Sequence, residues 1–206
     1  MKPTAPRLAL TCLLGAALLS ACSILPQSDP QDIYRLPDSA VAAANGATLD
    51  VALRILRPAA DDVLRGSRIA VRPQGNVFSV YQGARWSAPA PTLWRDHLVE
   101  AFYNDGRIAR VSSEGEGLRA DFELGGTLRG FHTEYHDGKP RVVIRFDARL
   151  AEAAGRNIVA SRRFTVTEDV AGGQVPAVVE AFGRASDIMA RQIIDWTAEQ
   201  LGQSRR

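Results

Sequence analysis

Apolar and polar residues alternate over three stretches in the second half of the chain, which predicts β-strands. The first stretch covers residues 122–135, and its alternation changes phase near Gly130, where we expect a β-bulge. Residues 142–150 give the most regular alternation, and residues 158–167 return as a third strand. The segment His136–Lys139 contains an Asp-Gly pair, which is typical of a hairpin turn. We therefore expect an antiparallel meander with one buried face.

Two other segments repeat their apolar residues at helical spacing. The first begins at Pro91, which suits a first helical position, and ends near Gly106, which can adopt a left-handed conformation. The second begins at Pro176 and ends near Gly202. We expect both helices to cover the sheet with their apolar stripes.

Shorter extended segments complete the expected sheet, at residues 32–36, 49–56, 68–72, 77–81 and 108–111. The sequence therefore predicts one α+β domain over residues 32–206. Its sheet is expected to be mainly antiparallel or mixed, and to be covered by two long α-helices.

The amino terminus has the three-part form of a secretory signal. Lys2 and Arg7 precede an apolar run over residues 8–19, which is shorter than the roughly 20 residues that span a bilayer. The following Leu-Ser-Ala-Cys resembles the lipobox of bacterial lipoproteins. This resemblance implies cleavage between Ala21 and Cys22, lipid on the Cys22 sulfur, and acylation of the new amino terminus, with palmitate as the expected acyl group. The alternative is a core helix followed by a chance cysteine.

The expected organisation is therefore a signal peptide at residues 1–21, a lipidated tether at 22–31 and the domain at 32–206. More than one acyl chain is needed for stable membrane attachment, and a lipoprotein has several. Ser23, rather than Asp, follows the cysteine. As an implication of the lipobox resemblance, the absence of Asp favours the periplasmic face of the outer membrane of a Gram-negative bacterium.

The net charge of the mature chain bears on its possible partners, and its cysteine content bears on how the domain is stabilised. The chain has 25 basic and 23 acidic residues, and Lys2 and Arg7 leave with the signal, so the mature chain is close to neutral. This charge gives no support for nucleic-acid binding. Cys12 also leaves with the signal and Cys22 carries lipid, so the mature domain is expected to fold without a disulfide.

No pattern in the sequence indicates catalysis. The chain lacks Gly-x-Ser-x-Gly, His-Glu-x-x-His and a Walker loop, so we expect a non-enzymatic protein with no catalytic residue and no cofactor besides the covalent lipid. His132 and His136 resemble a metal pair, but four strand residues span about 13 Å. That is too far for one zinc ion with ligands at about 2 Å, and we expect no metal site.

Tyr81, Arg85 and Trp86 are the candidates for partner binding, because Tyr, Arg and Trp are enriched at interface hot spots. The alternative, which we favour for Trp86, is a buried core residue. Arg145 and Arg149 beside Asp147 are interpreted as a solvated surface of mixed charge.

The order of features along the chain resembles the ABC-type transport auxiliary lipoprotein component family. The lipobox is followed by Tyr34-Arg35-Leu36, by a strand ending at Pro73, by Ala-Arg-Trp-Ser-Ala-Pro at 84–89, by Ala-Asp-Phe-Glu-Leu at 120–124, and by the long C-terminal helix. The resemblance implies a lipoprotein that serves an ABC transporter, with its permease and ATPase, and an MCE-type protein that extends across the periplasm. Such a system moves lipids or other apolar compounds between membranes.

The sequence leaves open the oligomeric state of the protein and the choice between its leading function and two alternatives. A homo-oligomeric ring would suit a ring-shaped partner. A membrane-tethered periplasmic lipid carrier, with its ligand between sheet and helices, is the alternative function, and a periplasmic hydrolase is disfavoured by the missing nucleophile motif.

Overall fold

Three long strands form the centre of the sheet: β7 (Phe122–His136), β8 (Lys139–Glu152) and β9 (Ile158–Asp169). The computed structural model describes residues 30–203, and the chain from residue 31 onward forms one compact unit. Ala21, Cys22 and the tether up to residue 29 lie outside the described residues. The described residues therefore comprise the domain that follows the tether.

The β7–β8–β9 meander is antiparallel, as predicted. The strand register shifts between Leu128 and Gly130, which confirms the bulge. Asp137 and Gly138 form the β7–β8 turn with φ angles of 49° and 75°. Positive φ at both central residues is what a type I′ hairpin turn requires, which confirms the turn expected from the Asp-Gly pair.

The other edge of β7 binds three shorter strands in succession, and all three are parallel to it. They are β2 (Leu49–Ile55), β3 (Ala59–Ala60) and β4 (Arg68–Gln74). The sheet is completed by β5 (Val77–Trp86), which pairs with β4, by β1 (Asp32–Tyr34), which pairs with β5, and by β6 (Ile108–Ser113), which pairs with β2.

The α+β class is confirmed, but the expectation of a mainly antiparallel sheet is corrected. Five of the eight strand pairings are parallel and three are antiparallel, so the nine-stranded sheet is mixed. The alternation of apolar residues shows which face of a strand is buried, but it does not show the direction of the neighbouring strand. Direction depends on how the connections cross over, which is a non-local property.

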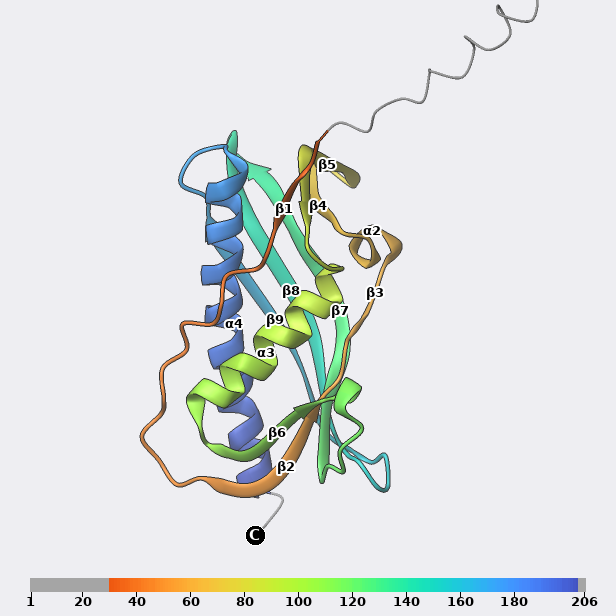
Figure 1. Ribbon diagram of the computed structural model, residues 1–206, viewed down its shortest axis with the longest axis vertical. Helices are drawn as coiled ribbons and strands as arrows, with labels where there is room; N and C mark the ends of the chain where they lie inside the picture. Colours follow the sequence, from red (N-terminus) through yellow and green to blue (C-terminus); the bar gives the residue numbers. More distant parts are fainter. Residues whose placement is uncertain (1–29, 204–206) are drawn as a thin grey trace, which may run out of the picture. The chain divides into compact units, whose positions relative to one another are not determined.

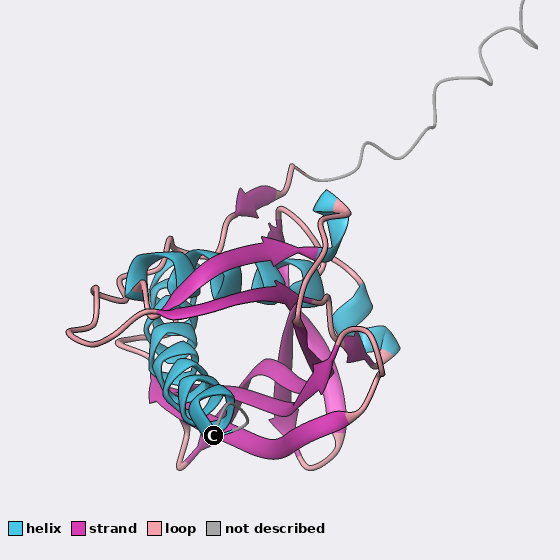
Figure 2. Cartoon of the chain, turned by 90° about the horizontal axis from the view of Figure 1, so that it is seen from below, coloured by secondary structure: helices cyan, strands magenta, loops and turns pink. Residues whose placement is uncertain are grey.

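Two long helices, α3 (Ala90–Asp105) and α4 (Val175–Gln203), confirm the helical prediction. Gly106 follows α3 with a left-handed φ of 77°, and its N–H donates to the Phe102 carbonyl, which closes the last turn. Short helical turns lie at α2 (Asp62–Arg65) and η2 (Glu114–Glu116). Figure 1 shows α3 and α4 in front of β7 to β9, and Figure 2 shows the strands as a curved layer with α4 on its inner side.

Large aromatic side chains fill the space between the helices and the sheet. Phe182 of α4 lies 4.6 Å from Phe131 and 5.2 Å from Trp86, measured between ring centroids. Trp94 of α3 contacts Phe146 of β8 at 5.9 Å. All five side chains are almost completely buried. This edge-to-face and offset packing is the arrangement that aromatic rings favour, and it makes a continuous core.

No helix within residues 30–203 combines the length and the apolar character that crossing a membrane would need.

Candidate functional site

The N-terminal strap, residues 35–48, connects β1 to β2 and is the first part of the domain after the tether and β1. It runs past α4 and α3 in Figure 1. The Ser39 hydroxyl donates to Asp187 Oδ1 of α4 at 3.0 Å, and the Ala40 N–H donates to the same atom at 3.2 Å. The Ser39 N–H donates to Glu100 Oε2 of α3 at 3.0 Å. These hydrogen bonds fix the strap to both long helices.

Asp187 also accepts a hydrogen bond from the buried His97, whose Nε2 lies 3.1 Å from Asp187 Oδ1. Burial lowers the pKa of His97, although Asp187 acts in the opposite direction. The ring is therefore neutral at neutral pH, with the proton on Nε2, because a carboxylate can only accept. A Cβ on Gly183 would lie 2.8 Å from the Pro37 ring, so the strap packs against α4 only because residue 183 has no side chain. This cluster is structural.

The three predicted partner-binding residues do not form one surface. Trp86 is fully buried and packs against Phe131 and Phe182, which agrees with the core interpretation favoured for it. Tyr81 is half-buried, and its Oη accepts a hydrogen bond from Thr133 Oγ1 at 3.0 Å. Burial raises the pKa of Tyr81. Partner contact therefore stays a prediction for Tyr81 and for Arg85, which is also half-buried.

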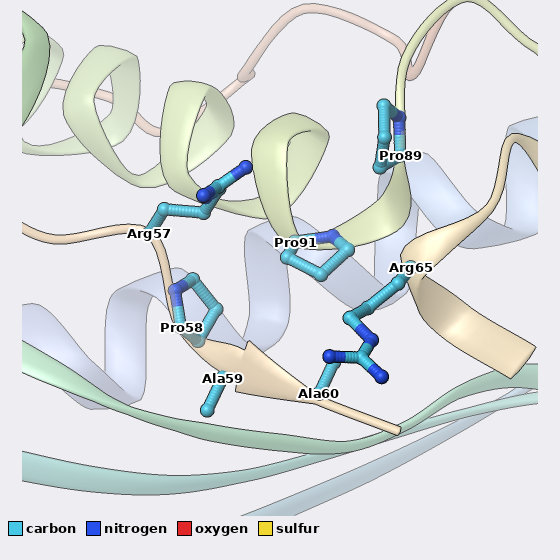
Figure 3. Close-up of a pocket in the computed structure, with 7 residues that line it drawn as sticks. All are labelled: Arg57, Pro58, Ala59, Ala60, Arg65, Pro89 and Pro91. Atoms are coloured by element: carbon cyan, nitrogen blue, oxygen red, sulfur yellow. The ribbon is translucent and has the colours of Figure 1, made fainter. Parts of the chain in front are cut away.

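A cavity of about 490 Å³ opens between the start of α3 and the segment around β3. Its lining residues are Arg57, Pro58, Ala59, Ala60, Arg65, Pro89 and Pro91. In Figure 3 the side chains of Arg57 and Arg65 reach it from opposite sides. Guanidinium groups are donors without acceptor capacity, so this cavity suits an anionic group and not a metal cation.

No local sequence signal indicates this cavity, because its residues come from three separate segments. Arg65 also forms an ion pair with Asp62, in which both side chains are mostly exposed at 63% and 87%. Exposed pairs of this kind contribute little to stability and exchange easily. Within the described part of the chain, the Arg57 guanidinium has no ion-pair partner, and that of Arg65 is only weakly engaged.

The two candidate metal-binding histidines differ sharply in their surroundings. His132 is buried, whereas the His136 side chain is 65% exposed. Burial, reinforced by the positive charges of Arg72 and Arg145, lowers the pKa of His132 to about 4. Within residues 30–203, no three His, Cys, Asp or Glu residues are grouped to hold a metal ion.

His132 borders a cluster that we call the covered triad, which consists of Arg72, Glu134 and Arg141. Arg141 donates from Nε and Nη2 to Glu134 Oε1 at 3.0 and 2.6 Å, and Arg72 donates to Oε2. The Glu134 side chain is only 10% exposed. Burial acts to raise the pKa of Glu134, but the hydrogen bonds and charges of Arg141 and Arg72 outweigh this effect and lower it. The carboxylate therefore stays charged.

Phe78 covers this part of the sheet, with its ring edge-on to His132 at 5.2 Å. Sequence reasoning missed the covered triad because Arg72 lies on β4, while Glu134 and Arg141 lie on β7 and β8. Only the strand register brings the three residues together. Its charges are paired with one another in a mostly buried position.

The sequence of this chain is similar to that of a known protein family and of one curated relative. The model of the ABC-type transport auxiliary lipoprotein component family matches residues 34–194. The uncharacterized protein bll6063 of Bradyrhizobium diazoefficiens is 30% identical over 164 residues, which cover 79% of this chain and 43% of that protein. The chain thus spans less than half the length of this curated relative.

Solved structures agree with the family match. Protein XCC0632 from Xanthomonas campestris, family-model DUF330, superposes with a TM-score of 0.78 at 28% identity, covering 84% of this chain and 98% of that one. The hypothetical protein CT253 from Chlamydia trachomatis shares the fold, with a TM-score of 0.51 at 6% identity over 74% of this chain and 98% of that one. The chain belongs to the ABC-type transport auxiliary lipoprotein component family.

Proposed function

We propose that this protein is held by lipid on Cys22 at the periplasmic face of the outer membrane, where it serves an MCE-type intermembrane transport system. The observation that supports this proposal is the family match over residues 34–194, which begins twelve positions after the lipobox cysteine. Signal cleavage between Ala21 and Cys22 would leave the domain as the periplasmic part of the mature lipoprotein. The transported compounds would be lipids or other apolar molecules.

The proposed mechanism is docking. The tether, residues 22–31, can extend at most about 36 Å, so the domain would stay close to the membrane surface. The strap, which is hydrogen-bonded to α3 and α4, would then hold these helices at a limited distance from the lipid anchor. Tyr81 and Arg85 are the proposed contact residues for the MCE-type protein or the permease. A homo-oligomeric ring would present several such surfaces to a ring-shaped partner.

The packing argues against the alternative of a lipid carrier with its ligand between sheet and helices. Phe131, Phe146 and Phe182 occupy that space together with Trp86 and Trp94, and all are almost fully buried. A lipid chain could enter only by displacing this close-packed core, and such rearrangements are costly.

The proposal is tested by crosslinking bacterial envelopes that contain the tagged, lipidated protein, followed by affinity purification and mass spectrometry. We expect an MCE-type protein or a transporter permease among the captured proteins. The Cys22→Ser variant serves as the control, and we expect it to leave the membrane fraction and to lose the capture. Membrane retention and full transport activity of Cys22→Ser, or capture of lipid without any transport component, would contradict the proposal.

A further inference from the structure

The face of β7, β8 and β9 that points away from the helices is here called the outer face. Along β8, the buried residues Ile144, Phe146 and Ala148 point toward the helices and alternate with the outer-face residues. Those outer-face residues include Arg145, Asp147 and Arg149. One end of the outer face holds the covered triad. The rest, which we call the uncovered part, includes the exposed Arg129, Arg149 and Arg163 together with the half-buried Arg145 and Asp147.

A second cluster of two arginines and one carboxylate lies on this uncovered part. Asp147 of β8 accepts from Arg163 Nε and Nη2 of β9 at 2.6 and 3.1 Å, and from Arg129 Nε of β7 at 3.1 Å. We call these residues the open triad. The Arg163 and Arg129 side chains are 71% and 54% exposed. Hydrogen bonds from Arg163, and then from Arg129, lower the pKa of Asp147 to about 2, so the triad has a net positive charge.

Two further arginines enlarge this charge. Arg145 and Arg149 lie two positions before and after Asp147, so they are on the same face at about 7 Å from it. Neither forms an ion pair with a described residue. Their neighbours across the strand pair are Thr165 and Ser161 of β9, whose side chains are short and uncharged.

The outer face therefore carries a local excess of positive charge, although the chain as a whole is close to neutral. Its arginines are Arg129, Arg145, Arg149 and Arg163, which we call the arginine face. Against these four cations stands the carboxylate of Asp147, which gives a net charge of +3. Glu123, near the start of β7, pairs with Arg54 and leaves this sum unchanged. The mature chain as a whole is close to neutral, so the concentration arises from the fold.

We propose that the arginine face docks on the phosphate groups of an anionic phospholipid bilayer. Guanidinium groups bind phosphate oxygens in a bidentate geometry and are less strongly hydrated than ammonium groups. Several of them on one strand surface can contact neighbouring headgroups at the same time. The ligand chemistry is therefore a lipid phosphate monoanion, which needs no cavity and no conformational change in the sheet.

The choice of a membrane over an acidic protein rests on the anchor proposed at Cys22. From β1 to β9 the sheet path crosses five strand pairings, which is about 24 Å at 4.8 Å each. The tether reaches at most about 36 Å, so the lipid and the arginine face can engage the same bilayer. Tethering keeps the face at high local concentration beside the headgroups, where even weak contacts are populated.

The test uses a chain that begins at Ser23 and therefore has no lipid, because the chain from residue 31 onward forms one compact unit. Its co-sedimentation is measured with vesicles of phosphatidylcholine, with and without phosphatidylglycerol, at low and physiological salt. We expect binding only to the anionic vesicles, with a loss of affinity at higher salt. Since each arginine near such a surface contributes about five-fold in binding, the double variant Arg145→Ser/Arg149→Ser should bind about 25-fold more weakly.

The matched control is Arg191→Ser, which removes an exposed arginine from α4 on the opposite side of the sheet and should leave vesicle binding unchanged. Both variants should unfold at the temperature of the parent chain, since the replaced arginines form no ion pair within residues 30–203. Equal binding to neutral vesicles, or unchanged binding by the double variant, would overturn the proposal.

A third outcome separates the membrane from an acidic protein. If the double variant bound vesicles normally but lost a crosslinked protein in envelopes, the face would be a protein-docking surface and the lipid assignment would be wrong. The vesicle assay involves neither Cys22 nor the transporter, so its failure is distinguishable from failure of the proposed transport role.

Discussion

The two arginine–carboxylate–arginine triads have the same chemistry and lie on the same face of the same sheet, yet their exposures differ. In the covered triad the Glu134 side chain is 10% exposed, with Arg72 and Arg141 at 24% and 30%. In the open triad Asp147 is 26% exposed, while Arg129 and Arg163 reach 54% and 71%.

The cause of the difference is strand order. At the end where β4 joins β7, Arg72 is directly beside Glu134 and Phe78 covers His132, so the charges are removed from water. Asp147 lies on the central strand of the meander, opposite Thr127 of β7, and the short strand β3 on the far side of Thr127 offers only Ala59 and Ala60, whose side chains are too small to cover the triad. Removing one partner from a buried charge cluster leaves an uncompensated charge, whereas exposed pairs contribute little. Breaking the covered triad should therefore cost more stability than breaking the open triad, and the exposed arginines of the open triad are available to a ligand.

The largest effect is expected from breaking the strand pairing beneath the open triad. Gly126 has a φ of 144°, and a Cβ there would overlap the backbone oxygen of Asp147. Gly126→Ala should therefore destabilise the fold by about 3–4 kcal/mol, measured by urea denaturation. Gly173→Ala is the control, because a Cβ added at that position meets nothing within 4 Å. Equal denaturation midpoints for the two variants would show that β8 does not approach Gly126 so closely.

The second prediction compares the loss of stability when the carboxylate of each triad, Glu134 or Asp147, is replaced by its amide. Glu134→Gln should lower the free energy of unfolding by about 2–3 kcal/mol, because Arg72 and Arg141 would lose their counter-charge in a mostly buried site. Asp147→Asn should cost less than about 1 kcal/mol, because its partners are well hydrated. Chemical denaturation of both variants in the same buffer measures the difference. An equal loss would remove the distinction between the triads.

Acid should weaken the covered end of the sheet. The folded-state pKa of His132, about 4, lies below the unfolded value of 6.5, so the unfolded chain takes up the proton first as the pH falls. The stabilisation is complete above pH 6.5 and is lost toward pH 4, by on the order of 2 kcal/mol. Buried His97, whose pKa is also lowered, acts in the same direction. Urea denaturation at several pH values measures this dependence.

The matched variant for this pH dependence is His132→Gln, which keeps a polar side chain beside Arg72, Glu134 and Arg145 but cannot titrate. Its stability should fall less steeply with acid than that of the parent protein. Identical slopes would assign the pH dependence to His97 or to the carboxylates.

The smallest effect tests the strap, which touches neither triad. Gly183→Ala should displace Pro37 from α4 and cost about 1–2 kcal/mol, because the added methyl has no room. Limited proteolysis should then cut within residues 35–48 sooner than in Gly202→Ala, whose Cβ meets nothing within 4 Å. Protection equal to that of the control would mean that the strap is not held by this contact. Anionic vesicle binding should be the same in both variants.

Local signals in the sequence predicted the meander, its bulge, the Asp-Gly turn and both long helices. These features depend on residues close together in the chain, such as the alternation around Gly130 and the glycine after α3. The parallel strands along β7 were not predictable in the same way, because β2, β3 and β4 meet β7 through connections that cross the fold.

The clusters of charged residues on the sheet were also only partly predictable, because they too depend on which strands lie side by side. Alternation along β8 correctly placed Arg145, Asp147 and Arg149 on one face, which we interpreted as a solvated surface; Arg149 is exposed there, whereas Arg145 and Asp147 are half-buried. The interpretation lacked Arg129 and Arg163, whose position beside Asp147 follows from strand register alone. Trp86 was correctly favoured as a core residue, since an aromatic side chain of that size is most often buried in a domain of this kind.

The most direct test of the division between the triads is the affinity of Asp147→Asn for phosphatidylglycerol vesicles. The substitution removes the one carboxylate of the open triad and releases Arg129 and Arg163 for lipid phosphate. We predict an affinity about five-fold higher than that of the parent chain, since one unit of positive charge is gained near the surface. An unchanged or lower affinity would contradict the account, because the open triad would then not face the membrane.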